Sequence, residues 1–215
     1  MTAVLFDLDG TLIDSLPNIT DAVNTVLQMR NLPDLPRQTV AGFVGCGVSV
    51  LVDRLIAATL LERAERAAVL SDLMAAYDKE AKKTKVFPGV RAALEALHDQ
   101  STPMGLVTNK PRAPLVLTLA AADLERFFQV VVAGDDLEER KPDPMPVSHA
   151  MAALGVDRAI FVGDSEIDAA TAKAADIPFV LFTEGIRQIP VVDMSFDAKF
   201  DDFGDLVDCL GNLIR

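Results

Sequence analysis

The sequence is poor in the residues that build disulfide frameworks and histidine metal sites. Its 215 residues include two cysteines, Cys46 and Cys209, and two histidines, His98 and His149. Two cysteines are too few for a disulfide framework and are typical of a reducing compartment. The histidines fall in segments of helical pattern without metal-ligand spacing, so neither is assigned a role.

Positive charge is also scarce. The 20 lysines and arginines are outnumbered by 32 aspartates and glutamates, which gives a formal net charge of -12 at pH 7. No basic run offsets this excess, so neither a nucleic acid nor an anionic membrane is expected as a partner. A small anionic substrate would need a local cluster of positive charge. A monomer and a homodimer both stay open.

Long apolar runs are missing as well. No stretch approaches the roughly 20 apolar residues of a membrane span. The first apolar run, in MTAVLFDLDG, meets two aspartates too early for a signal peptide. We therefore expect a cytoplasmic protein without a membrane span.

What the sequence does contain is an alternation of short apolar runs with segments of helical length. The runs cover residues 4–8, 104–108, 130–133, 160–162 and 179–182, and the helical segments cover 89–100, 112–122, 144–154 and 166–175. Uninterrupted apolar runs are typical of buried parallel strands. The alternation predicts an α/β fold with a doubly wound, Rossmann-like parallel sheet.

Residues 16–85 break this alternation. They contain helical patterns at 18–30, 49–58 and 63–82, and no convincing strand. We interpret this segment as an all-helical cap inserted into an α/β core of residues 1–15 and 86–215. Pro88 and Gly89, in VFPGV, mark the return to the core.

Polar residues gather where the predicted strands end. They are Asp7 and Asp9 after the first run, Thr108 and Asn109 at the second, Lys141 a loop beyond the third, and Asp164 and Asp168 after the fourth. Open parallel sheets bind ligands at the carboxyl ends of their strands. We therefore expect these side chains to meet in one site.

The acidic members of this group predict a metal. Three carboxylates that converge on one point repel each other without a cation, and hard oxygen ligands suit Mg²⁺, so Asp7, Asp9 and Asp164 indicate a magnesium site. A carboxylate beside a metal is also a competent nucleophile toward phosphorus and forms an aspartyl phosphate.

The remaining members suit the phosphoryl group of such a reaction. The Thr108 hydroxyl, the backbone amides around Asn109 and the Lys141 ammonium would hold its oxygens and spread their charge. Phosphoryl transfer depends mainly on such positioning and charge neutralisation.

Each segment taken alone also has an ordinary explanation. An acidic pair is commonly solvated, and a Thr-Asn after a strand is common turn chemistry. KPDP fits a proline-rich connection, and GDSEID fits the capped start of a helix. Their occurrence together, in one order and at strand ends, indicates an active site.

The four segments DLDGT, VTN, RKPDP and GDSEID resemble the four motifs of the haloacid dehalogenase superfamily. The resemblance covers nearly the whole chain, and the helical insertion lies where some members carry a helical cap. It implies that Asp7 is the nucleophile and Asp9 the general acid and base. It further implies that Mg²⁺ is held by the Asp7 carboxylate, the Asp9 backbone carbonyl and Asp164. Supporting roles are expected for three residues: Thr11, Ser165 and Asp168.

Within the superfamily, FVGCGVSVLVDRLI, GLVTNKP and GDDLEERKPDP resemble segments of bacterial phosphoglycolate phosphatases. This resemblance implies hydrolysis of a small anionic phosphate monoester, with 2-phosphoglycolate as the leading substrate. A sugar phosphatase, a pyrophosphatase and a β-phosphoglucomutase-like phosphotransferase are the alternatives within the same chemistry.

Substrate contacts are expected from two places. Gly45 and Gly47 precede a predicted helix, whose first amides are unpaired and suited to an anion. Asn109 and Lys110, after the second strand, are further candidates for substrate binding, and Arg54 is another on weaker grounds.

A phospho-receiver domain is the alternative from a different functional class. It also gathers acidic residues, a threonine and a lysine at the ends of a parallel sheet, but it signals and does not turn over substrate. Its acidic pair and its phosphorylated aspartate lie on separate strands, and it has no helical insertion. DLDGT and the helical segment therefore favour the hydrolase.

Overall fold

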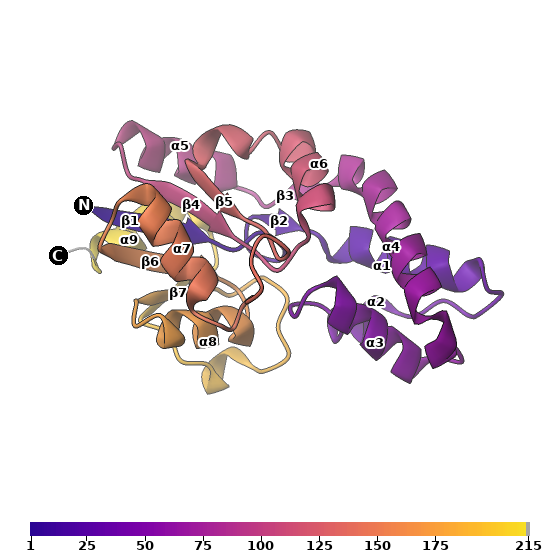
Figure 1. Cartoon of the computed structure of the whole chain (residues 1–215). Helices are drawn as coiled ribbons and strands as arrows, with labels where there is room; N and C mark the ends of the chain where they lie inside the picture. Colours follow the sequence, from indigo (N-terminus) through magenta and orange to yellow (C-terminus); the bar gives the residue numbers. More distant parts are fainter. Residues whose placement is uncertain (214–215) are drawn as a thin grey trace.

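The computed structural model describes residues 1–213 of the chain, and its centre is a parallel sheet (Figure 1). Six strands lie in the order β5-β4-β1-β6-β7-β8, and all neighbouring pairs are parallel. They are β1 (Thr2–Phe6), β4 (Met104–Val107), β5 (Val130–Val132), β6 (Arg158–Gly163), β7 (Phe179–Phe182) and β8 (Ala198–Phe200). The chain builds outward from β1 on one side and then on the other, so the order changes direction beside β1. Such a point is where doubly wound sheets bind ligands.

Helices cover both faces of this sheet. They are α5 (Val90–Asp99), α6 (Arg112–Ala122), α7 (Met145–Leu154), α8 (Glu166–Ala174) and α9 (Leu206–Gly211), with short 3₁₀ turns η3 (Glu125–Phe127), η4 (Val191–Asp193) and η5 (Phe203–Asp205). Side chains alternate along β1: Val4 and Phe6 join the core under α5, α6 and α9, and Ala3 and Leu5 join the core under α7 and α8. The predicted α/β class with a doubly wound parallel sheet is confirmed.

Every regular element between Leu16 and Lys83 is helical. These elements are α1 (Leu16–Gln28), α2 (Arg37–Ala41), α3 (Val48–Ala58), η1 (Arg63–Glu65), α4 (Arg66–Glu80) and η2 (Ala81–Lys83). They share a separate apolar core that includes Val23, Leu55 and Leu73. In Figure 1 these purple helices gather beyond one end of the sheet. We call residues 16–83 the helical insertion.

A small strand pair joins the insertion to the sheet. β2 (Ile13–Asp14) and β3 (Lys85–Val86) are antiparallel, with Ile13 opposite Val86 and Asp14 opposite Lys85. The chain therefore leaves and re-enters the α/β part at one place. The sequence-based assignment of Lys85 to the strand-free helical segment was wrong, because a two-residue strand is too short to show periodicity.

Other differences from the sequence-based elements are small and local. β8 and α9 were not predicted, since one has three residues with an exposed central lysine and the other has six residues. The five-residue helix α2 was also missed. Within residues 1–213, every helix falls short of the length and apolar character that a bilayer span needs.

Candidate active site

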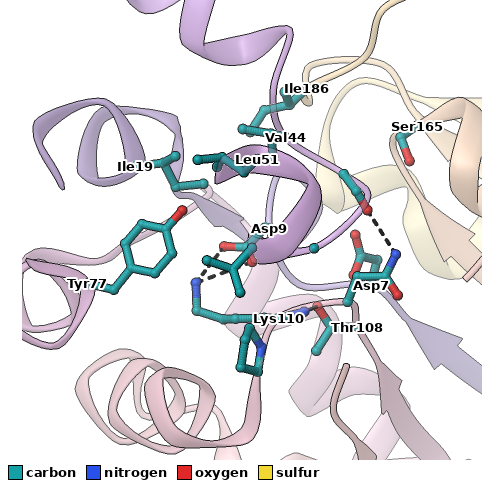
Figure 2. A pocket seen from close by; sticks show the side chains of 15 residues that line it. Asp7, Asp9, Ile19, Val44, Leu51, Tyr77, Thr108, Lys110, Ser165 and Ile186 are labelled. Carbon is teal, nitrogen blue, oxygen red and sulfur yellow. Dashed lines mark hydrogen bonds and ion pairs between the residues drawn. The ribbon is translucent and has the colours of Figure 1, made fainter. Parts of the chain in front are cut away.

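A cavity lies between the carboxyl ends of β1 and β4 and the helical insertion (Figure 2). It holds about 570 Å³ of empty space, including the part open to solvent. Its core-side walls are Asp7, Asp9, Thr108, Asn109, Lys110, Pro111, Ser165 and Ile186, and its insertion-side walls are Ile19, Val44, Gly45, Gly47, Val48, Leu51 and Tyr77. The structure thus places residues from the DLDGT, VTN and GDSEID segments around one space with the predicted glycines.

The turn after β1 explains why glycine follows the acidic pair. Gly10 has φ +88°, a conformation that side chains disfavour, and a Cβ added there would lie 2.4 Å from Asp164 Oδ2. Glycine therefore lets the turn approach Asp164 closely. The next residue, Thr11, uses this approach, because its hydroxyl donates to Asp164 Oδ1 at 2.6 Å.

Asp7 and Asp9 have separate cationic partners, which resolves their repulsion. Asp7 Oδ1 lies 2.8 Å from Lys141 Nζ, and Asp9 lies 3.2 and 3.3 Å from Lys110 Nζ through its two oxygens. The Lys141 side chain is 2% exposed and the Lys110 side chain is 10% exposed. Ion pairs shielded in this way are screened by salt less than surface pairs.

Three buried carboxylates form the acidic centre of the site. One oxygen from each of Asp7, Asp164 and Asp168 lies within 4.8 Å of the others. Asp168 is already engaged, because Lys141 Nζ donates to its Oδ1 at 2.7 Å and Ser165 Oγ donates to its Oδ2 at 2.6 Å. The backbone N–H groups of Asp164 and Ser165 donate to the same Oδ2 atom. Asp168 therefore accepts from four donors, one of them the Lys141 ammonium, and with Ser165 it is placed to support the site. Asp164 accepts from two neutral donors, the Thr11 hydroxyl and the Ile186 N–H, so Asp7 and Asp164 are the better candidates for a metal.

The pKa values of these groups reflect an excess of buried negative charge. Burial raises the pKa of Asp7 from its ordinary 3.8 to about 6, and Lys141 only partly opposes this. Burial likewise raises the pKa of Asp164 well above 3.8, and the charges of Asp168 and Asp7 add to the effect. Burial lowers the pKa of Lys141, but Asp168 and Asp7 outweigh it and hold that pKa above 10.5. One ammonium among three carboxylates leaves room for a further cation, and an all-oxygen donor set fits Mg²⁺.

The segment after β4 places its residues at the junction of three parts of the site. Thr108 Oγ1 accepts from the backbone N–H of Lys110 at 3.2 Å. The Asn109 side-chain amide donates to the Gly45 carbonyl and to the Lys141 carbonyl, both at 2.9 Å. Asn109 therefore ties the helical insertion to the loop that carries Lys141.

The insertion contributes the loop before α3, where Gly45 has φ +110° and Gly47 has φ +86°. Gly47 is the cap residue of α3, which begins at Val48. Arg54 was a weaker candidate for substrate binding. In the structure it contacts the segment that leads into this loop: it donates to the Gly42 carbonyl at 3.1 Å and contacts Cys46 Sγ at 3.7 Å.

Tyr77 and Ile186 line the cavity but were not predicted as site residues. The Lys110 ammonium lies 5.5 Å from the centre of the Tyr77 ring. Both side chains are labelled in Figure 2. Burial, together with Asp9, raises the pKa of Tyr77, so its phenol stays protonated. Neither residue belongs to a recognisable motif, because both reach the site through tertiary packing.

The fold and the site define an α/β protein with a buried acidic centre at the carboxyl edge of its sheet, beneath a helical insertion. The family model described as "Haloacid dehalogenase-like hydrolase" matches residues 4–182. The chain belongs to this family, which confirms that it is a hydrolase of the superfamily that its motifs resemble.

Individual relatives agree over almost the full length. A phosphoglycolate phosphatase from Rhodobacter capsulatus is 41% identical over 207 residues, which cover 95% of this chain and 94% of the relative. One from Cupriavidus necator is 45% identical over 188 residues, 86% of this chain and 81% of the relative. A crystal structure of a predicted phosphoglycolate phosphatase from Haemophilus somnus 129pt superposes with a TM-score of 0.92 at 30% identity, covering 97% of both chains.

Proposed function

We propose that this chain is a Mg²⁺-dependent phosphatase that hydrolyses small phosphate monoesters through an aspartyl phosphate on Asp7, with 2-phosphoglycolate as its substrate. The observation that carries the proposal is the position of Asp7, which joins the acidic centre, pairs with Lys141 and lines the cavity. The relatives named as phosphoglycolate phosphatases support the choice of substrate. In this proposal residues 16–85 act as a cap and residues 1–15 and 86–215 form the catalytic core.

In the proposed reaction, an Asp7 oxygen attacks phosphorus and the bond from phosphorus to the ester oxygen breaks. Lys141 and the Thr108 hydroxyl hold phosphoryl oxygens as their charge shifts. Mg²⁺, when bound, supplies additional positive charge to the phosphoryl group, and Asp7, the Asp9 backbone carbonyl and Asp164 would hold it.

Asp9 is the proposed general acid and base. It gives a proton to the departing alkoxide, and afterwards it takes a proton from the water that attacks the phosphorylated Asp7. In the structure its carboxylate is paired with Lys110 in the wall of the cavity. Catalysis therefore requires Asp9 to turn from this lysine toward the leaving group.

The carboxylate of 2-phosphoglycolate needs an anion site separate from the one that holds the phosphoryl group. Among the described residues that line the cavity, Lys110 carries the only positive charge, and the Gly45–Val48 loop adds the first amides of α3. Asn109 lies between these two groups and bonds the Gly45 carbonyl. We assign Lys110, Asn109 and the loop amides to substrate binding.

The other walls help to choose among the alternatives. Apart from the Tyr77 phenol, the side chains that the insertion places in the wall are apolar: Ile19, Val44 and Leu51 offer no hydrogen bonds to sugar hydroxyls. A site built for a sugar phosphate would need such partners, because buried hydroxyls are costly when unpaired. This favours a short acidic substrate over a sugar phosphate.

The test compares 2-phosphoglycolate with ethyl phosphate, which has the reacting group and lacks the carboxylate. Charge-assisted hydrogen bonds of roughly 1.5 to 3 kcal/mol predict that kcat/KM is about one to two decades higher for 2-phosphoglycolate. Equal values for the two esters would refute the substrate assignment and leave a phosphatase.

A variant of the loop tests its role. At Gly47 φ is +86° and a Cβ would lie 3.3 Å from the Asn109 carbonyl oxygen, so Gly47→Val should displace the loop and erase most of the preference. Turnover of a generic aryl phosphate should stay closer to normal. Gly155→Val is the matched control, because Gly155 also has positive φ but has nothing within 4 Å of an added Cβ. A Gly47→Val protein with the full preference would exclude the loop from recognition.

A further inference from the structure

Residues 183–188, which we call the strap, follow β7 and support Asp164 from outside the four motifs. The Ile186 backbone N–H donates to Asp164 Oδ2 at 2.6 Å, on the opposite oxygen from the Thr11 hydroxyl. Asp164 is 1% exposed. One oxygen of this carboxylate is thus oriented by the DLDGT turn and the other by the strap.

The strap packs directly against the acidic centre. A Cβ added to Gly185 would lie 2.3 Å from the Asp164 Cβ and 2.4 Å from the Gly10 carbonyl oxygen. Real Cβ atoms do not approach so closely, so only glycine fits there. A displacement of the strap therefore acts on Asp164 without any intervening layer.

Arg187 holds the strap in this position. Its guanidinium contacts the Asp164 carbonyl at 3.4 Å and the Phe182 carbonyl at 3.5 Å, and it also donates to the Thr183 carbonyl. A guanidinium has five donors in a rigid plane, so it can bridge several carbonyls at once. Arg187 thereby joins both ends of the strap to the end of β7 and to the Asp164 backbone.

The strap also contacts the helical insertion. The Gln188 side-chain amide donates to the Ala41 carbonyl in α2 at 2.8 Å. The Ile186 side chain lies near Val44 and Leu51 of the insertion in the cavity wall (Figure 2). One short segment therefore contacts Asp164 on one side and the insertion on the other.

We propose that Arg187 is a positioning residue for Asp164: it holds the strap so that the Ile186 N–H fixes the carboxylate, and Gln188 extends this support to the insertion. The inference rests on the proposed function, in which Asp164 is a Mg²⁺ ligand. Loss of a hydrogen-bonding partner of a metal ligand typically weakens metal binding by about 10- to 100-fold. The chain's own strap thus contributes to Mg²⁺ affinity although none of its side chains is a proposed ligand.

The experiment is calorimetric titration of the full chain with MgCl₂ alone, without substrate. Thr11→Val, which removes the bond to one Asp164 oxygen, should bind Mg²⁺ about 10- to 100-fold more weakly. Arg187→Met, which acts on the other oxygen through the Ile186 N–H, should bind about 10-fold more weakly, at the lower end of that range. Arg158→Met is the control and should bind like the wild type, because Arg158 is exposed at the far end of β6. At saturating Mg²⁺, turnover of Arg187→Met should recover toward the wild-type value, which a general loss of structure would not allow.

Two further variants keep the test decisive. If Arg187→Met does not fold, Arg187→Gln replaces it with the same expected direction. Gln188→Ala, at an exposed position, should weaken Mg²⁺ binding by a few fold if the contact with the insertion steadies the strap. Wild-type affinity in a folded Arg187 variant overturns the inference, and wild-type affinity in Gln188→Ala overturns its extension to the insertion. A wild-type protein that binds no Mg²⁺, or an Asp164→Ala variant with unchanged affinity, instead refutes the proposed metal site.

Discussion

Replacing Lys141 by methionine should destabilise the metal-free protein far more than an ordinary lysine substitution does. Lys141 is the ammonium within 2.8 Å of both Asp7 and Asp168, and its side chain is 2% exposed. Methionine has a similar volume and no charge, so Lys141→Met leaves three buried carboxylates without their cation. Removing one partner of a buried ion pair costs about 3 to 5 kcal/mol. For a chain of this size the loss corresponds to a fall in Tm of roughly 6 to 20 °C.

The assay is thermal unfolding followed by far-UV circular dichroism, first in excess chelator and then with Mg²⁺. The deficit should shrink when Mg²⁺ is added. A cation that binds only the folded state stabilises it by mass action, and the variant gains more than the wild type because its acidic centre has lost the Lys141 charge. It should also shrink as the pH falls, because burial already raises the pKa of Asp7 in the wild type and protonation relieves the repulsion among the carboxylates. Lys173→Met, on the exposed face of α8, should change stability by less than about 0.5 kcal/mol. A Lys141→Met protein as stable as the wild type in chelator would refute this account of the acidic centre.

Three further outcomes follow from the same site. Asp7→Asn should lower turnover by several decades with an intact fold, since an amide is not a nucleophile; near-normal steady-state activity in a folded variant would exclude the mechanism. Asp164→Ala should weaken Mg²⁺ binding in calorimetry far more than Asp168→Ala does, because Asp168 is already paired with the Lys141 ammonium whereas the donors to Asp164 are neutral; the reverse order would contradict the assignment of ligands. In excess chelator, the difference in unfolding free energy between wild type and Asp7→Asn should change by up to about 3 kcal/mol between pH 4 and 7. The pKa of Asp7 rises on folding, so its protonated carboxyl favours the folded state at low pH. This contribution is lost as the pH rises past about 6. If urea titrations gave the same difference in unfolding free energy across this pH range, the pKa of Asp7 would not be raised by burial.

The sequence predicted the strands and the residues at their ends because both leave local signals. Uninterrupted apolar runs identified most of the sheet. Asp7 and Asp164 come directly after β1 and β6, and Asp9 is three residues beyond the end of β1. The strands β2 and β3 were missed because two residues do not make an apolar run, and β8 was missed because Lys199 interrupts its apolar residues. Local sequence pattern therefore predicts the strands that carry the site and the carboxylates at their ends.

The rest of the site depends on contacts that a single sequence does not encode locally. The Ile186 N–H that bonds Asp164 is a backbone group, and any residue but proline could supply it. Asn109 was expected near the substrate because it follows a strand. Its side-chain amide bonds the Gly45 carbonyl, 64 residues away, and this contact depends on packing alone. Tyr77 was not predicted as a site residue, because it lies in α4, whose weak amphipathic pattern does not show which face is buried.

The antiparallel strands β2 and β3 make the helical insertion exchangeable. Asp14 and Lys85 are opposite each other in register, so the chain segment between them begins and ends at neighbouring positions. Even a two-residue hairpin turn could join them. Residues 15–84 could then be replaced by a different helical unit without altering the order or register of the parallel sheet. Because loop-closure entropy grows only slowly with loop length, units of quite different size should be tolerated at this junction. Protein engineering could therefore recombine insertions on one unchanged acidic centre and alter which esters are admitted while the phosphoryl chemistry stays the same.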